Sequence, residues 1–234
     1  MLLHGFGATR RGWDAVVERL DGERYRPLAL DLPGHGEAGA LRPVTVAACT
    51  EWVHTLSPRR FALAGYSMGG RIALRVALAD PDRVSRLVLI STTAGIESEE
   101  QRIMRRAADE ALAQRLGREP FEQFVRRWRA QPLFADDPPA VNEAARADQR
   151  RNDPLGLAAA LRGIGAGALT PVWDRLGELA MPALVLAGQR DERYAAIGRR
   201  LADALPRGEL RIVPGGHTLP LENPQAVADA LDGR

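Results

Sequence analysis

The segment with the clearest potential for chemistry is Gly65-Tyr66-Ser67-Met68-Gly69, which matches the G-x-S-x-G pattern. Residues 60–64 before it are predicted to form a short strand, and residues 70–78 after it a helix. In this setting the glycines permit a sharp turn, and the helix N-terminus favours negative charge that develops beside the exposed serine hydroxyl. An ordinary glycine-rich turn would explain the five residues but not the elements around them. Ser67 is therefore the candidate nucleophile.

A serine hydroxyl is inert at neutral pH unless a base takes its proton. Of the four histidines, His217 lies in a loop just after the last predicted strand, at the sheet edge where Ser67 also lies. His54 falls inside a predicted helix, and His35 lies in a Pro-Gly-His-Gly turn, so both are interpreted as structural. The alternative for His217 is a solvated loop histidine, but its position favours the role of base.

The base needs a carboxylate that holds its imidazole in one tautomer. Asp191 follows the predicted strand 183–187 directly, and it gives the chain order Ser, Asp, His that a nucleophile elbow of this kind requires. Glu192 and Asp174 are the competing candidates. The position at the end of a strand favours Asp191.

Negative charge on a reacting oxygen needs two backbone N–H donors. Met68, directly after the serine, is predicted to supply one of them. Phe6 is predicted to supply the other from the loop His4-Gly5-Phe6-Gly7, which follows the first strand. In this interpretation His4 shapes the loop and is not a base.

Composition narrows the class of protein. The chain has 234 residues, of which 45% are hydrophobic, and a net charge of +2. All the basic residues are arginine and they form no run interleaved with aromatic residues, so nucleic acid is not an expected partner. The chain has one cysteine, Cys49, and shows neither a long apolar run nor a signal peptide. We therefore expect a cytoplasmic protein that does not enter a membrane. No metal cluster or nucleotide loop is visible, so no metal and no cofactor is expected.

Short apolar strands alternate with helices, which predicts an α/β fold with a mostly parallel sheet covered by helices on both faces. Strands are expected at 1–3, 25–30, 60–64, 84–90, 183–187 and 209–213. Residues 97–167 break the alternation with four charged helices and no strand. Because this stretch is far longer than an ordinary connection, we expect a helical cap at 97–167 inserted into a core formed by 1–96 and 168–234.

The whole chain resembles the α/β-hydrolase-fold superfamily, on His4-Gly5-Phe6-Gly7, the loop 31–36 and the elbow 65–70. More narrowly it is similar to the 2-succinyl-6-hydroxy-2,4-cyclohexadiene-1-carboxylate synthases of menaquinone biosynthesis. The narrower signals are Gly69-Gly70-Arg71 and, in the cap, Trp128-x-x-Gln-Pro-x-Phe-Ala.

The resemblance implies a lyase that eliminates pyruvate from 2-succinyl-5-enolpyruvyl-6-hydroxy-3-cyclohexene-1-carboxylate, with Ser67 acting as a base. Such a substrate carries several carboxylates, which arginine binds in a bidentate manner. The resemblance gives the candidate substrate-binding residues as Tyr66, Arg71, Arg105, Trp128 and Arg151, with Arg106 as a substitute for Arg105. A solvated helix face is the alternative for each arginine.

The resemblance leaves two alternatives and one departure. The same triad would serve a carboxylesterase or a C–C bond hydrolase, and a non-catalytic binding protein could share the fold. The fold normally begins with one or two strands before the first strand here, so either the start codon is assigned too late or the sheet edge is reduced at the N-terminus. The oligomeric state stays open.

Overall fold

A computed structural model of the chain describes residues 1–233. Its sheet has six strands, all parallel, in the order β2-β1-β3-β4-β5-β6. The strands are β1 (Leu2–Leu3), β2 (Ala29–Leu30), β3 (Phe61–Tyr66), β4 (Val84–Ile90), β5 (Ala183–Gly188) and β6 (Gly208–Val213). This sheet confirms the predicted α/β fold.

Strand β4 has the predicted bounds, whereas β2 does not. The prediction of a strand over 25–30 was wrong for its first four residues, since the strand contains only Ala29 and Leu30, although the Leu28 carbonyl still accepts from the Leu2 N–H at 2.9 Å. Two causes act together: β1 supplies only Leu2 and Leu3 as partners, and Pro27 has no N–H to donate.

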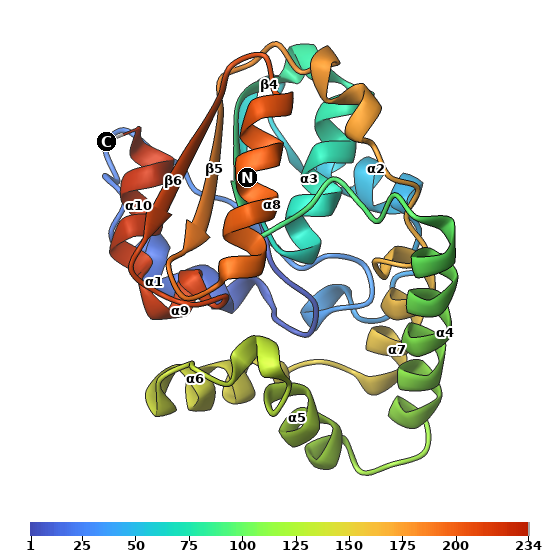
Figure 1. The fold of residues 1–234 in the computed structure, drawn as a ribbon. Coiled ribbons are helices and arrows are strands. Elements are labelled where there is room, and N and C mark those ends of the chain that lie inside the picture. Colours follow the sequence, from blue (N-terminus) through green and yellow to red (C-terminus); the bar gives the residue numbers. More distant parts are fainter. Residues whose placement is uncertain (234) are drawn as a thin grey trace.

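Helices cover both faces of the sheet (Figure 1). In Figure 1, α1, α9 and α10 lie on one side of the sheet and α2, α3 and α8 on the other. These helices are α1 (Asp14–Val17), α2 (Val46–Leu56), α3 (Met68–Ala79), α8 (Glu192–Ala204), α9 (Leu219–Glu222) and α10 (Pro224–Asp232). Alternate residues of β4 pack into the two layers, Leu87 and Leu89 into one and Val88 and Ile90 into the other. None of the helices within 1–233 is long and apolar enough to cross a membrane.

Residues 97–167, here called the helical insertion, contain helices and no strand. Its α-helices are α4 (Glu99–Leu116), α5 (Phe121–Arg129), α6 (Pro139–Gln149) and α7 (Pro154–Ile164). A small apolar cluster around Phe124, Leu157 and Leu161 holds part of the insertion together. Figure 1 shows α5 and α6 beyond the carboxyl ends of the strands, where ligands of parallel sheets bind.

The turn between β3 and α3 brings two backbones into contact. Ser67 has a φ of 51°, which is unusual for a residue with a side chain. Two residues later, Gly69 lies against the end of β1, where an added Cβ atom would stand 2.2 Å from the Leu3 carbonyl oxygen. A glycine at position 69 is therefore required by the approach of α3 to β1.

This contact gives the first prediction. Replacing Gly69 with alanine forces α3 away from β1, and we expect a loss of about 2–3 kcal/mol of stability, or roughly 4–12 °C in Tm. The matched control is Gly177→Ala, because a Cβ atom at Gly177 would meet nothing within 4 Å. Calorimetry measures both Tm values. Equal Tm values for the two variants would contradict the steric argument.

Candidate active site

Three side chains from the ends of three strands form one hydrogen-bonded row. His217 Nδ1 lies 2.6 Å from Asp191 Oδ2, and His217 Nε2 lies 3.2 Å from Ser67 Oγ. Because a carboxylate can only accept, Nδ1–H donates to Asp191 and Nε2 is left to accept from the serine hydroxyl. The geometry is that of a serine with a base and an orienting acid.

Asp191 is fixed by the helix that it begins. It is the N-cap of α8, and its Oδ1 accepts a hydrogen bond from the Tyr194 backbone N–H at 3.2 Å. The carboxylate is buried, whereas Glu192 and Asp174 are both exposed. The structure therefore brings Asp191 to His217 and leaves the two competing carboxylates in solvent.

Aromatic rings from three elements surround His217. The ring centroids of Tyr66, Tyr194 and Phe134 lie 5.5, 4.6 and 5.9 Å from that of the imidazole. His217 is 2% exposed, so these rings keep water from most of its surface. The same burial raises the pKa of Tyr66, which keeps this phenol neutral beside the row.

The loop that carries His217 is also tied to the helical insertion. The hydroxyl of Thr218 donates to Asp137 Oδ2 at 2.6 Å, and the guanidinium of Arg129 donates to the same oxygen. Arg129 and Asp137 form a buried ion pair, and Arg129 Nε also donates to Asn142 Oδ1 at 3.0 Å. Breaking one partner of such a pair leaves a buried charge uncompensated, so this contact fixes the insertion to the residue after His217.

The predicted oxyanion donor in the first loop is aimed by the carbonyl next to it. Gly5 O accepts from His4 Nδ1 at 2.8 Å and from the Ala8 N–H at 3.2 Å. His4 Nε2 accepts from the Leu32 N–H at 3.1 Å, so the ring is neutral, and its burial lowers its pKa. Because a peptide unit is planar, the Phe6 N–H points opposite to the held Gly5 carbonyl. Gly5 and Phe6 line the same cavity as Ser67.

The second predicted donor is Met68, at the start of α3. The first N–H groups of a helix have no acceptor within the helix. Backbone hydrogen bonds to the Ser67 carbonyl come from Gly70 and Arg71, and the Met68 N–H comes before them in the first turn. It is thus available for an anion beside Ser67, together with the partial positive charge of the helix end.

A cavity of about 500 Å³ opens beside Ser67 and His217, between the sheet edge and the insertion. Arg71 lines it, is only 6% exposed, and has no carboxylate within ion-pair distance among residues 1–233. Its Nε is buried without a hydrogen-bond partner, and desolvation lowers its pKa. A buried guanidinium without a counterion is costly, and an anionic ligand would remove that cost.

Of the other predicted binding residues, three line this cavity and one does not. Tyr66, Trp128 and Arg105 line it, and Arg105 Nε is paired with Asp109 at 2.8 Å. Its substitute, Arg106, bonds weakly to the Gly167 carbonyl outside the cavity.

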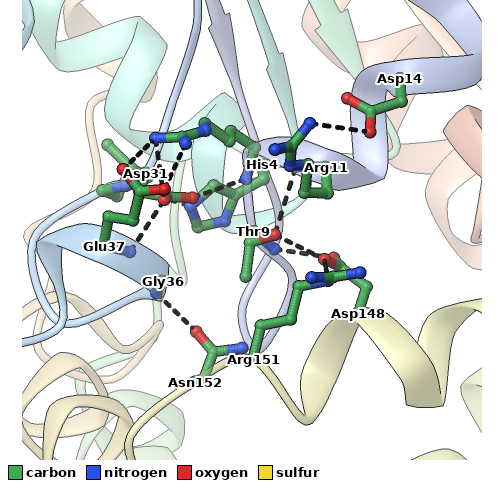
Figure 2. Close-up of polar contacts among 12 residues, drawn as sticks. His4, Thr9, Arg11, Asp14, Asp31, Gly36, Glu37, Asp148, Arg151 and Asn152 are labelled. Carbon is green, nitrogen blue, oxygen red and sulfur yellow. Dashed lines mark hydrogen bonds and ion pairs between the residues drawn. The ribbon is translucent and has the colours of Figure 1, made fainter.

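The structure does not bring Arg151 to the cavity. Its side chain is 59% exposed, lies 3.8 Å from Asp148 Oδ1 and is not part of the cavity wall. The chain turns just beyond the end of α6, and this turn buries the neighbouring Asn152 while Arg151 faces outward. Figure 2 shows Arg151 beside Asp148 and Asn152 directed at Gly36.

Several cavity residues were missed by the sequence. Tyr194 lies three positions after Asp191 on α8, which places it on the same side of that helix as the acid. Gln131 and Phe134 belong to the cap motif that was recognised but received no role. Arg193 and Arg200 also line the cavity, and no motif marks them. Within 1–233, no cluster of three or more metal-ligating side chains is present.

The family model described as "Alpha/beta hydrolase family" matches residues 1–230. A Salmonella paratyphi B protein named 2-succinyl-6-hydroxy-2,4-cyclohexadiene-1-carboxylate synthase is 31% identical, over 99% of this chain and 91% of its own. A Bacillus subtilis (strain 168) protein that bears this name provisionally is 35% identical, over 95% of this chain and 85% of its own.

Two solved structures are similar in both sequence and fold. MenH from S. aureus has a TM-score of 0.92 at 31% identity, covering 99% of this chain and 91% of that one. A thermophilic esterase from Thermogutta terrifontis has a TM-score of 0.84 at 29% identity, covering 99% and 87%. The fold is therefore shared by proteins with different named activities.

Arg71 supplies the second prediction. If the Arg71 guanidinium binds a carboxylate, succinate will raise the Tm of the wild-type protein and will not raise that of Arg71→Met. Without ligand, Arg71→Met should be as stable as the wild type or more so, because a buried charge is removed. Differential scanning fluorimetry measures both effects.

The control for this prediction is Arg175→Met, since Arg175 is exposed and paired with Glu178 at 2.7 Å. This variant should keep the full succinate response. An equal response in Arg71→Met would mean that the anion binds elsewhere.

Proposed function

The chain belongs to the alpha/beta hydrolase family, and we propose that within this family it is a carbon–oxygen lyase of menaquinone biosynthesis. The substrate is 2-succinyl-5-enolpyruvyl-6-hydroxy-3-cyclohexene-1-carboxylate, and the products are pyruvate and 2-succinyl-6-hydroxy-2,4-cyclohexadiene-1-carboxylate. The observation that carries the proposal is the buried, unpaired Arg71 in the cavity beside Ser67 and His217. Named relatives with the same reaction support it.

In this proposal Ser67 acts as a base. Asp191 holds His217 with Nδ1–H toward the acid, so that Nε2 takes the serine proton. The serine oxygen then takes the ring proton next to the succinyl carbonyl of the substrate. No acyl-enzyme forms, and the imidazolium that results is stabilised by the Asp191 carboxylate.

The proton and electron-pair transfers of the elimination balance. As the C–H bond breaks, its electron pair forms an enolate on the succinyl carbonyl, whose charge the Phe6 and Met68 N–H groups receive. The enolate then re-forms the carbonyl, the ring gains a second double bond, and the C–O bond to the enolpyruvyl group breaks. The departing enolate takes a proton from His217 and becomes pyruvate.

Arginines distinguish this reaction from ester hydrolysis. The substrate carries several carboxylates, and Arg71 is a buried cation with no carboxylate at ion-pair distance among residues 1–233. Arg105 lines the same cavity, and its guanidinium keeps N–H groups beyond the one bonded to Asp109. A neutral ester would leave the Arg71 charge uncompensated, whereas a polycarboxylate uses it. The esterase reaction, which the Thermogutta terrifontis relative performs by name, is the alternative outcome of the test.

The third prediction tests reaction and residue together. The purified protein should release pyruvate from the enolpyruvyl substrate and cleave p-nitrophenyl acetate poorly. Ser67→Ala should lower pyruvate release by about 10³-fold or more, because the triad acts as a unit. Lactate dehydrogenase coupled to NADH oxidation measures the pyruvate.

The control is Ser85→Ala, since Ser85 lies near the start of β4, far along the strand from the cavity. It should retain wild-type turnover. Rapid ester cleavage without any pyruvate would replace the lyase by an esterase.

A further inference from the structure

The turn that ends α6 faces the loop that carries the Phe6 N–H. We call residues 148–152 the clamp turn and residues 4–9 the oxyanion loop. Three side chains of the clamp turn are buried, with Asp148, Gln149 and Asn152 only 7%, 2% and 6% exposed. Each of the three meets the oxyanion loop, although the two segments are far apart in the sequence.

Asp148 holds the far end of the oxyanion loop. Its Oδ2 accepts from the Thr9 backbone N–H at 2.8 Å, and its Oδ1 accepts from the Thr9 hydroxyl at 2.5 Å. Figure 2 shows both contacts, with Asp148 reaching up from α6 to Thr9. A buried carboxylate is stable only when such donors replace water, so the Thr9 backbone is fixed strongly.

Asn152 holds the middle of the loop. Its Nδ2 donates to the Gly7 carbonyl at 2.8 Å, and its Oδ1 accepts from the Gly36 N–H at 2.9 Å. One amide group therefore joins the oxyanion loop to the loop after β2. Both ends of the amide are used, which sets its orientation.

Gln149 lies against the backbone of the oxyanion loop at Gly7. Gly7 has a φ of +75°, and an added Cβ atom there would stand 2.9 Å from Gln149 Nε2. The backbone of the loop thus lies directly against the clamp turn. On the opposite side His4 and Ala8 hold the Gly5 carbonyl, so the Phe6 peptide lies between two fixed points.

We propose that Asp148 and Asn152 are positioning residues, which hold the oxyanion loop from the insertion side and so set the direction of the Phe6 N–H. The proposal rests on the function proposed above in one respect, the binding of negative charge by this N–H. A donor stabilises such charge only when it is already aimed, because turning it during the reaction would consume the gain. Neither residue lines the cavity that contains Ser67, so they act through the loop.

Asn152→Asp tests the clamp with an almost unchanged shape. The new carboxylate can still accept from the Gly36 N–H, but it opposes the Gly7 carbonyl with an oxygen instead of an N–H. We expect amide hydrogen exchange at residues 5–9, resolved by NMR, to become about 10-fold faster or more, with exchange in β5 unchanged. We also expect kcat for pyruvate release to fall by about 10–100-fold while KM changes by less than about 3-fold.

Arg150→Ala is the matched control. Arg150 lies in the same turn but faces solvent, where it pairs with Glu122 at 2.9 Å. Exchange at residues 5–9 and kcat should both stay at wild-type values in this variant. Asp148→Asn, a second test of the clamp, should accelerate exchange at Thr9, because an NH₂ group then faces one of the two Thr9 donors.

Two outcomes overturn the proposal. One is unchanged exchange at residues 5–9 in both Asn152→Asp and Asp148→Asn. The other is an equal acceleration in the loop and in β5, which would mean that the substitutions lower global stability only. If the wild-type protein releases no pyruvate, the proposed function is wrong, and the exchange measurements still decide whether the clamp holds the loop.

Discussion

The contact between α3 and the end of β1 is the constraint on which the site depends. Gly69 approaches the Leu3 and His4 carbonyls so closely that no side chain fits there. This approach places the start of α3, with Ser67 before it, directly beside the loop that follows β1. Two donors from different parts of the chain, Phe6 and Met68, can then face one oxygen. The left-handed φ of Ser67 is the strain that the close approach imposes, and the hydrogen bond from the Thr92 hydroxyl to the Ser67 carbonyl supports it.

Arginines in the cavity and arginines on the surface of the insertion affect stability differently. Surface arginines of the insertion, such as Arg150 and Arg162, are paired with glutamates and contribute little to stability. Arg71 is buried and has no ion-pair partner within the described part of the chain, which lowers stability in the free protein. Such a cost persists in a fold when a ligand offsets it. The helix dipole of α3 adds to the positive potential near Ser67, so the cavity favours anions at both its serine and its arginine.

The sequence predicted most of the strands and most of the site residues that the strand ends position. The strands β3 to β6 and the residues just beyond them could be placed because apolar runs and strand ends are local signals, and Ser67, Asp191 and His217 all follow such ends. The insertion was harder. Its four helices were visible from their pattern, but the direction of each side chain at a helix end depends on tertiary contacts. Arg151 was therefore chosen where the fold buries Asn152, and Asp137 gave no signal although it holds Thr218.

The same contacts change how the insertion should be understood. A cap over an active site is usually pictured as a mobile lid that opens and closes over the catalytic groups. Here α6 and the residues before it reach both loops that carry those groups, Asp137 through Thr218 and the clamp turn through Gly7 and Thr9. Moving this part of the insertion would break a buried ion pair and several buried hydrogen bonds, each costly to leave unpaired. Any opening that admits substrate therefore leaves α6 and these two loops in place.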